Sequence, residues 1–141
     1  MFVLDTNILS AIMSARPSPE VAAWIAGQPE DALFTTTTCQ AEILADLAVM
    51  AEGRRRVALE TAARAIFADD FNGSVLQFGA AAAAAYADIF AARRKAGRPT
   101  ALLDLMIAAV ARANGAGVVT RDIGGFEDCS VPLVDPWQAL S

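Results

Sequence analysis

The sequence predicts an α/β protein, a three-layer α/β/α sandwich around a central, mainly parallel sheet of four to five strands. Short apolar runs without polar alternation, such as Phe2-Val3-Leu4, are typical of strands that helices cover on both faces. Segments with helical periodicity separate these runs, an order that favours parallel pairing with right-handed crossovers. No linker or repeat interrupts the 141 residues, so we expect a single domain over residues 1–141.

Proline, glycine and capping patterns divide the first half of the chain. Pro17 and Pro19 separate the first two helices. Thr37 and Gln40 have the spacing of a capping box, which places the start of the third helix at Thr37. Asn72-Gly73 ends the fourth. The expected elements are a strand over Phe2–Leu4, helices over Ile8–Ala15 and Glu20–Ala26, a strand over Ala32–Thr35, and helices from Thr37 to about Met50 and over Glu52–Phe71.

The second half continues the alternation. Gly79 introduces an alanine-rich helix whose basic end complements the carbonyl end of the helix dipole. Gly115 stops the next helix, in which Leu103 is expected to face inward. The expected elements are a strand over Ser74–Phe78, helices over Ala80–Lys95 and Leu102–Asn114, a strand over Gly117–Thr120, a turn or short helix over Ile123–Asp128, and an edge strand over Val131–Val134.

The composition excludes several kinds of chemistry. The chain has no histidine, which excludes Ser-His and Cys-His catalysis and leaves too few ligands for an ordinary zinc site. The net charge of -5 argues against a broadly basic nucleic-acid binder. Cys39 and Cys129 have no CxxC spacing and are expected to be buried thiols of a reducing compartment. No apolar stretch is long enough for a membrane span and no signal peptide is evident, so a cytoplasmic protein is expected.

Four acids stand where a parallel sheet would bring them to one edge. Asp5 and Asp122 follow apolar strands, and Glu42 and Asp104 lie near the starts of mostly apolar helices. Ligands of open α/β sheets bind outside the carboxyl ends of the strands. Because burying unpaired carboxylates is costly, we expect the four to converge on one hydrated Mg²⁺ or Mn²⁺, with Asp5 at the centre.

A simpler interpretation exists for each acid taken alone. Asp5, Asp104 and Asp122 have the positions of helix caps or turn residues. Glu42 has the position of a solvated helix residue, and acids are common in first helical turns because of the helix dipole. The occurrence of all four in matching contexts favours the metal site.

The ordered motifs of the chain resemble those of the PIN-domain family, and most of all the VapC and FitB-like toxins of bacterial toxin–antitoxin pairs. The resemblance spans essentially the whole sequence. The motifs that carry it are Leu4-Asp5-Thr6-Asn7, Glu42 in a threonine-rich helix start, Gly97-Arg98-Pro99 ahead of Asp104-Leu105-Met106-Ile107, Val118-Val119-Thr120-Arg121-Asp122, and the ending Pro136-Trp137.

This resemblance implies a Mg²⁺- or Mn²⁺-dependent ribonuclease that is usually dimeric and is held inactive by a small VapB-like antitoxin. It implies that Asp5, Glu42, Asp104 and Asp122 are the metal-binding acids, and that polar side chains support them. These supporting residues are Thr6, Asn7 and Thr120. The chain departs from the family pattern at one position. Family members commonly carry an acid just before the phenylalanine of the last motif, whereas this chain has Gly124-Gly125-Phe126.

Basic side chains are candidates for holding the RNA backbone, since phosphate contacts come mainly from arginine and lysine. For each one, a solvated helix end is an equally good interpretation. The candidates are Arg54, Arg55, Arg56, Arg93, Arg94, Lys95 and Arg98.

Two other functions fit part of the pattern. A phosphotransfer domain of the haloacid-dehalogenase or receiver type also places acids at strand ends, but it needs a lysine near that edge, and Lys95 is expected in a helix tail. Asn7 also stands where the dehalogenase type has its second aspartate. A non-catalytic module whose acids bind a partner's arginines is the remaining alternative.

Overall fold

The computed structural model describes residues 1–138, and its centre is a five-stranded sheet in which every neighbouring pair is parallel. The strand order is β3-β2-β1-β4-β5. In β1 and β4 the pairs Phe2 with Gly117 and Leu4 with Val119 set the register. The strands are β1 (Phe2–Leu4), β2 (Leu33–Thr36), β3 (Val75–Leu76), β4 (Gly117–Val119) and β5 (Leu133–Val134).

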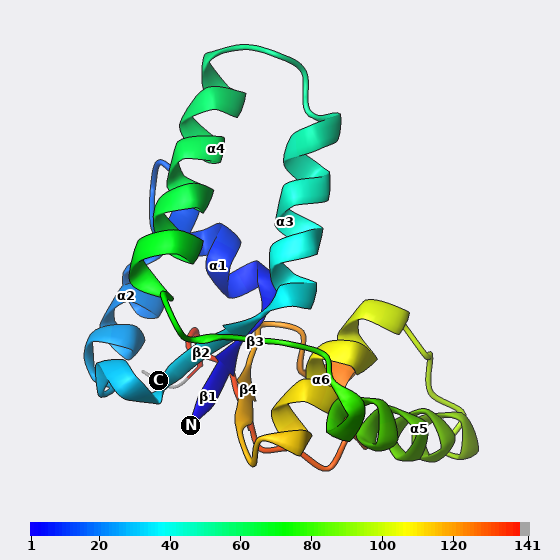
Figure 1. Ribbon diagram of the computed structural model, residues 1–141. Helices are drawn as coiled ribbons and strands as arrows, with labels where there is room; N and C mark the ends of the chain where they lie inside the picture. Colours follow the sequence, from blue (N-terminus) through cyan, green and yellow to red (C-terminus); the bar gives the residue numbers. More distant parts are fainter. Residues whose placement is uncertain (139–141) are drawn as a thin grey trace.

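Helices cover the sheet, with α5 and α6 packed together on one side and α1 and α2 on the other (Figure 1). The pair α3 and α4 runs side by side and projects beyond the sheet. The helices are α1 (Thr6–Met13), α2 (Pro19–Ala26), α3 (Thr37–Val49), α4 (Arg54–Ala65), α5 (Ala80–Lys95), α6 (Leu102–Ala113) and α7 (Ile123–Phe126), with short turns η1 (Glu30–Ala32) and η2 (Ile66–Asp70). Among the described residues, no helix is both long and apolar enough to cross a bilayer.

The packing of the core explains why the sequences of the central strands are uninterrupted apolar runs. Val3 and Leu4 of β1 and Val118 and Val119 of β4 are fully buried. Ile107, from α6, is equally buried and belongs to the same core cluster. Because both faces of these strands are covered, no polar alternation is needed, and the predicted α/β/α fold class is confirmed.

Several local expectations were wrong, each for a physical reason. The N-cap of α3 is Thr36, whose Oγ1 accepts the Cys39 N–H at 3.0 Å, so the capping-box assignment to Thr37 and Gln40 fails. Leu103 is 43% exposed rather than inward, since it precedes the buried stripe of α6. The expected helix over Glu52–Phe71 is regular only in α4 and ends in the π-helical turn η2.

Other expectations hold within limits. Cys39 and Cys129 are buried free thiols, as predicted. The single domain over residues 1–141 stays a prediction, because residues 139–141 lie outside the described residues. The strands β1 and β4 lie side by side and end at the same edge of the sheet, directly before Asp5 and Thr120. The fold therefore places the polar residues that follow these strands together.

Candidate active site

Asp5 is both a helix cap and the buried acid at the end of β1. Its side chain is 4% exposed and caps α1, with Oδ1 accepting the Thr6 N–H at 2.7 Å. Its Oδ2 accepts the Thr120 hydroxyl at 2.8 Å and the Asn7 amide at 3.2 Å. The helix-cap interpretation of Asp5 is therefore confirmed, and its second carboxylate oxygen is held at the end of β4, while its role as a metal ligand stays a prediction.

Asn7 and Thr120 tie the end of β1 to the end of β4. The Asn7 amide donates to Thr120 Oγ1 at 3.3 Å, and Asn7 Oδ1 accepts the Arg121 N–H at 3.2 Å. Thr120 Oγ1 also accepts the Asp122 N–H at 3.0 Å. These bonds fix the Asp5 carboxylate relative to the loop that carries Asp122, so the polar residues expected to support the acids do contact them.

Glu42 reaches the same edge from α3. Thr6 Oγ1 donates to Glu42 Oε1 at 2.9 Å, while the Thr6 N–H donates to Asp5. Thr6 therefore bridges the two carboxylates through its side chain and its backbone. Glu42 is half-buried, unlike a freely solvated helix residue.

Asp104 and Asp122 form a second pair, next to Gly125. Asp104 lies in the first turn of α6, and Asp122 caps α7 through a bond from the Gly125 N–H to Oδ1 at 3.1 Å. A Cβ added to Gly125 would lie 2.6 Å from Asp122 Oδ2 and 3.2 Å from Asp104 Oδ2. The two carboxylates therefore border one small space.

Electrostatic interactions connect the two pairs. The pKa of Asp5 is raised from its usual 3.8 to about 6. Burial is the largest cause, the hydrogen bonds from Thr120 and Thr6 oppose it, and the charges of Asp104 and Glu42 contribute to the rise. Burial also raises the pKa of Glu42, with Asp104 adding to the rise. Burial and then Asp122 raise the pKa of Asp104. Asp104, rather than Asp5, therefore interacts with all three other acids.

The acids fit a hard divalent cation by their chemistry, although they do not yet form a closed cage. All four donate only carboxylate oxygens, and their mutual repulsion would be relieved by a cation. Within residues 1–138, no three acidic, cysteine or histidine side chains already enclose a metal position. Two adjacent pairs at one edge suit Mg²⁺, which keeps several waters and takes few protein ligands.

The pKa of Asp5 predicts how the metal-free protein responds to pH. Because folding raises this pKa, the Asp5 contribution to stability is fully present below about pH 4 and is lost as the pH rises through about 6. In chelator, the free energy of unfolding of the wild type, relative to Asp5→Asn, should fall by about 2 to 3 kcal/mol between about pH 4 and pH 7. Urea titrations of both proteins measure this difference, and parallel pH profiles would contradict it.

One of the predicted RNA-binding cations is not available to RNA. Arg93 is 2% exposed and donates to the carbonyls of Pro99, Gly124 and Glu127, so its assignment as a phosphate contact is wrong. Its helical spacing from the buried Ile89 was the sequence feature that could have shown it to face inward. Its charge lowers the pKa of Asp104.

The other predicted cations lie in three places. Arg98 pairs with Glu127 at 2.8 Å and also with Asp128. Arg94 and Lys95 are exposed at the end of α5. Arg54, Arg55 and Arg56 begin α4 at the end of the helix pair that lies away from the sheet (Figure 1). A cation that the sequence did not single out, Arg121, lies over the ring of Trp137 at 4.5 Å.

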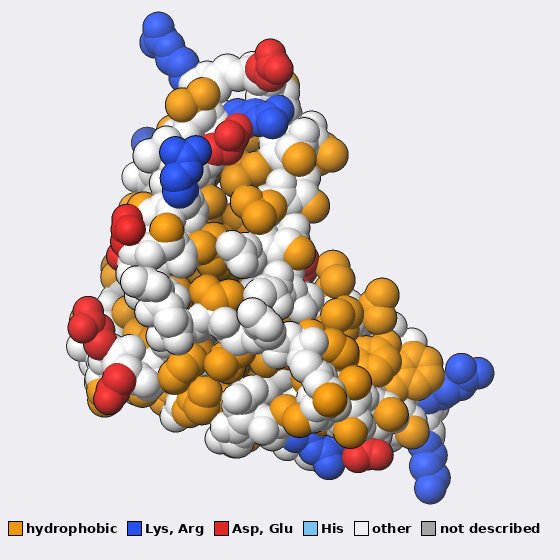
Figure 2. Space-filling view, viewed as in Figure 1, with side chains coloured by type: hydrophobic (Ala, Val, Ile, Leu, Met, Phe, Trp, Pro, Cys, Tyr) orange, Lys and Arg blue, Asp and Glu red, His pale blue; other side chains and the backbone are white. Residues whose placement is uncertain are grey.

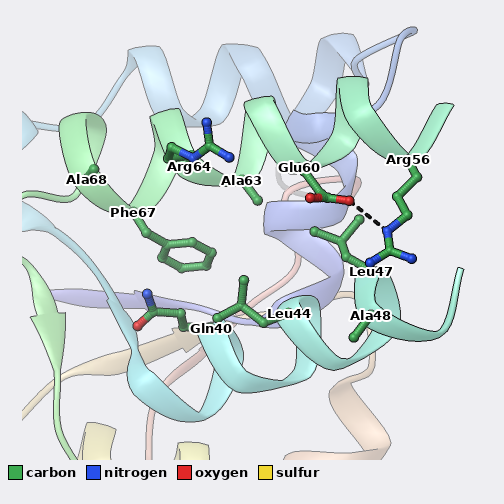
Figure 3. Close-up of a pocket in the computed structure, with 10 residues that line it drawn as sticks. All are labelled: Gln40, Leu44, Leu47, Ala48, Arg56, Glu60, Ala63, Arg64, Phe67 and Ala68. Atoms are coloured by element: carbon green, nitrogen blue, oxygen red, sulfur yellow. Dashed lines mark hydrogen bonds and ion pairs between the residues drawn. The ribbon is translucent and has the colours of Figure 1, made fainter. Parts of the chain in front are cut away.

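An apolar groove separates α3 from α4 and is distinct from the acidic edge. Its volume is about 400 Å³, and its lining includes Leu44, Leu47 and Phe67, with the Arg56–Glu60 ion pair of 2.7 Å at one end (Figure 3). Figure 2 shows hydrophobic side chains filling this region and charged side chains at its margins. Exposed apolar surface of this kind is typical of a protein interface.

Known proteins resemble the chain over nearly its whole length. A family model described as PIN domain matches residues 2–130. The plasmid stability protein StbB of Pseudomonas syringae pv. tomato is 36% identical over 99% of this chain and 100% of its own length. The VapC ribonuclease Y4jK of Sinorhizobium fredii is 35% identical over 98% of this chain and 99% of its own. The solved structure of FitAB bound to an IR36 DNA fragment superposes with a TM-score of 0.89 at 29% identity, covering 98% of this chain and 96% of that one.

Proposed function

This chain belongs to the PIN-domain family, and on that premise we propose that it is a cytoplasmic, divalent-metal-dependent ribonuclease that acts as the toxin of a toxin–antitoxin pair. The observation that carries the proposal is the grouping of four carboxylates at the carboxyl edge of β1 and β4. A chain without histidine has few other ways to hydrolyse a phosphodiester.

Each acid has a role in this proposal. Asp5, Glu42, Asp104 and Asp122 would hold Mg²⁺ or Mn²⁺. Such an ion, when bound, lowers the pKa of a coordinated water and offsets charge on a phosphoryl oxygen. Thr120 orients Asp5 by its hydrogen bond to Oδ2, and Thr6 holds Asp5 and Glu42 at a fixed separation. These hydrogen bonds would therefore hold the carboxylates of Asp5 and Glu42 close together, ready for a cation that neutralises their charge.

RNA is the proposed substrate, as it is for the VapC ribonuclease relative. Exposed arginines and lysine offer phosphate contacts around a protein whose net charge is -5. Arg93 is excluded by burial, and Arg98 and Arg56 are engaged in ion pairs. The remaining candidates are Arg54, Arg55, Arg94 and Lys95.

A small VapB-like antitoxin and a second copy of the chain are the proposed protein partners. The structurally similar FitAB assembly supports a partnered protein. The exposed apolar side chains of α3 and α4, among them Leu44 at 51% and Val57 at 63%, also support a protein-binding surface.

Cleavage of single-stranded RNA by the antitoxin-free protein tests the proposal. We expect cleavage with Mg²⁺ or Mn²⁺, loss of cleavage in excess chelator, and recovery when Mn²⁺ is restored, because a bound divalent cation would offset the charge of the four acids and activate the attacking water. A fluorescent RNA measured at each metal concentration gives the result. Undiminished cleavage in chelator would contradict metal dependence, and a stable acyl-phosphate on the protein would favour phosphotransfer instead.

A further inference from the structure

Two contacts hold residue 122 in place beside Asp104. The Asp122 N–H donates to Thr120 Oγ1 at 3.0 Å, and Asp122 Oδ1 accepts the Gly125 N–H at 3.1 Å. The first contact fixes the backbone against the end of β4. The second fixes the direction of the carboxylate, because it draws the side chain over the first turn of α7.

The carboxylate occupies the space that a side chain at residue 125 would take. A Cβ on Gly125 would lie 2.6 Å from Asp122 Oδ2, 3.1 Å from Asp122 Cγ and 3.2 Å from Asp104 Oδ2. Contacts below 3.0 Å are essentially never made by a real Cβ, so one of the groups would have to move. The observed position of Asp122 beside Asp104 therefore requires that residue 125 has no side chain.

Backbone conformation does not explain this glycine. Gly53, Gly73, Gly97 and Gly115 have positive φ angles, whereas Gly125 does not. Alanine is therefore allowed at residue 125 by its backbone, and only the neighbouring carboxylates oppose it.

The adjacent glycine gives a natural comparison. A Cβ on Gly124 would meet nothing closer than Asp122 Oδ1 at 4.0 Å, which is an ordinary contact. Gly124 lies in the same short helix and also lacks a positive φ. The two positions thus differ mainly in their distance from the acids.

We propose that Gly125 is a positioning residue whose missing side chain lets Asp122 and Asp104 face one shared cation position. The proposal rests on the function proposed above and concerns how this chain builds that site. Position 125 is where the resemblance leads one to expect an acid, and here Asp122 fills the adjoining space instead.

A methyl group at residue 125 should displace the acid without unfolding the protein. The clashing atoms are the far end of the Asp122 side chain, which can rotate away. The rotation breaks the cap bond to the Gly125 N–H, while alanine favours helix more than glycine does, so the two effects on stability oppose each other.

Calorimetric titration of the full chain with Mn²⁺ tests the proposal. The proteins to compare are the wild type, Gly125→Ala, Gly124→Ala, Asp122→Asn and the double variant Gly125→Ala/Asp122→Asn. We expect Gly125→Ala and Asp122→Asn each to weaken Mn²⁺ binding about 10- to 100-fold, and Gly124→Ala to change it less than about twofold. In the Asp122→Asn background, Gly125→Ala should have no further effect, because the group that it displaces is already altered.

Failure of this inference is separable from failure of the proposed function. Wild-type affinity in Gly125→Ala, alongside weakened binding in Asp122→Asn, would overturn the positioning role alone. An equal loss from Gly125→Ala in both backgrounds would also overturn it, because the effect would not pass through Asp122. If the wild type binds no Mn²⁺, or binds it equally well after Asp5→Asn, the metal site itself is wrong and the inference falls with it.

Discussion

Replacement of Asp104 by asparagine is expected to reduce RNA cleavage by at least about 10²- to 10³-fold, because a bound metal supplies several kcal/mol of charge stabilisation and each 1.4 kcal/mol is tenfold in rate. Asp104 is the choice because its charge interacts with those of Asp5, Glu42 and Asp122. The pKa of Asp104 is shifted by burial and by neighbouring charges, and no hydrogen bond contributes to the shift. An asparagine at this position therefore breaks no described hydrogen bond.

Folding should survive this change. Removing one of several like charges relieves repulsion, so Asp104→Asn should unfold in chelator at the same temperature as the wild type or higher. Asp88→Asn, at an exposed position of α5, is the matched control and should cleave RNA at the wild-type rate. Cleavage by Asp104→Asn within about tenfold of the wild-type rate would contradict its role at the metal.

Replacement of Arg93 by methionine is expected to lower the free energy of unfolding by about 3 kcal/mol or more, since hydrogen bonds from charged groups contribute about 1.5 to 3 kcal/mol. Arg93 donates to Pro99 O at 2.6 and 3.1 Å, to Gly124 O at 3.1 Å and to Glu127 O at 2.8 Å. Methionine keeps the apolar stem but leaves these carbonyls without their donor.

The loss should appear as a fall in Tm of about 6 to 12 °C in a thermal unfolding scan, at about 2 to 4 °C per kcal/mol. The neighbouring Arg94→Met, at an exposed position of the same helix, is the control and should shift Tm by less than about 2 °C. Amide exchange over α7 should accelerate in Arg93→Met, because two of the lost bonds anchor that segment. Equal Tm values for the two variants would show that the buried guanidinium is not an anchor.

The fold followed from sequence because its determinants are local and repeated. The runs Phe2–Leu4 and Gly117–Val119 lie at the centre of the sheet, where helices cover both faces. Strands in this position are apolar throughout. The grouping of Asp5 with Asp122 then follows from topology, since parallel neighbours end at one edge. The start of α3 at Thr37 was predicted correctly, whereas its capping residue was not, because both Thr36 and Thr37 have the chemistry of a cap and Thr36 is the one that accepts the Cys39 N–H.

The finer arrangement of the site depends on contacts that a single sequence does not encode locally. Arg93 stands in a basic triplet that has the pattern of a solvated helix end, and only the loops around Pro99 and Gly124 make it a buried anchor. Gly125 was noticed as a departure, but its distance to Asp122 depends on how α7 docks beside α6. Likewise, the pairing of Asp104 with Asp122 needs the two helix starts to be in place.

Anomalous diffraction from crystals grown with Mn²⁺ tests the central claim most directly. A peak should appear at the carboxyl edge of β1 and β4, with carboxylate oxygens of Asp5 and Asp104 bound at about 2.1 Å and Glu42 and Asp122 either bound directly or joined through water. The result that would contradict the claim has two parts. The protein cleaves RNA with Mn²⁺, but crystals grown at a saturating Mn²⁺ concentration show no anomalous peak among these four acids, or show the ion elsewhere.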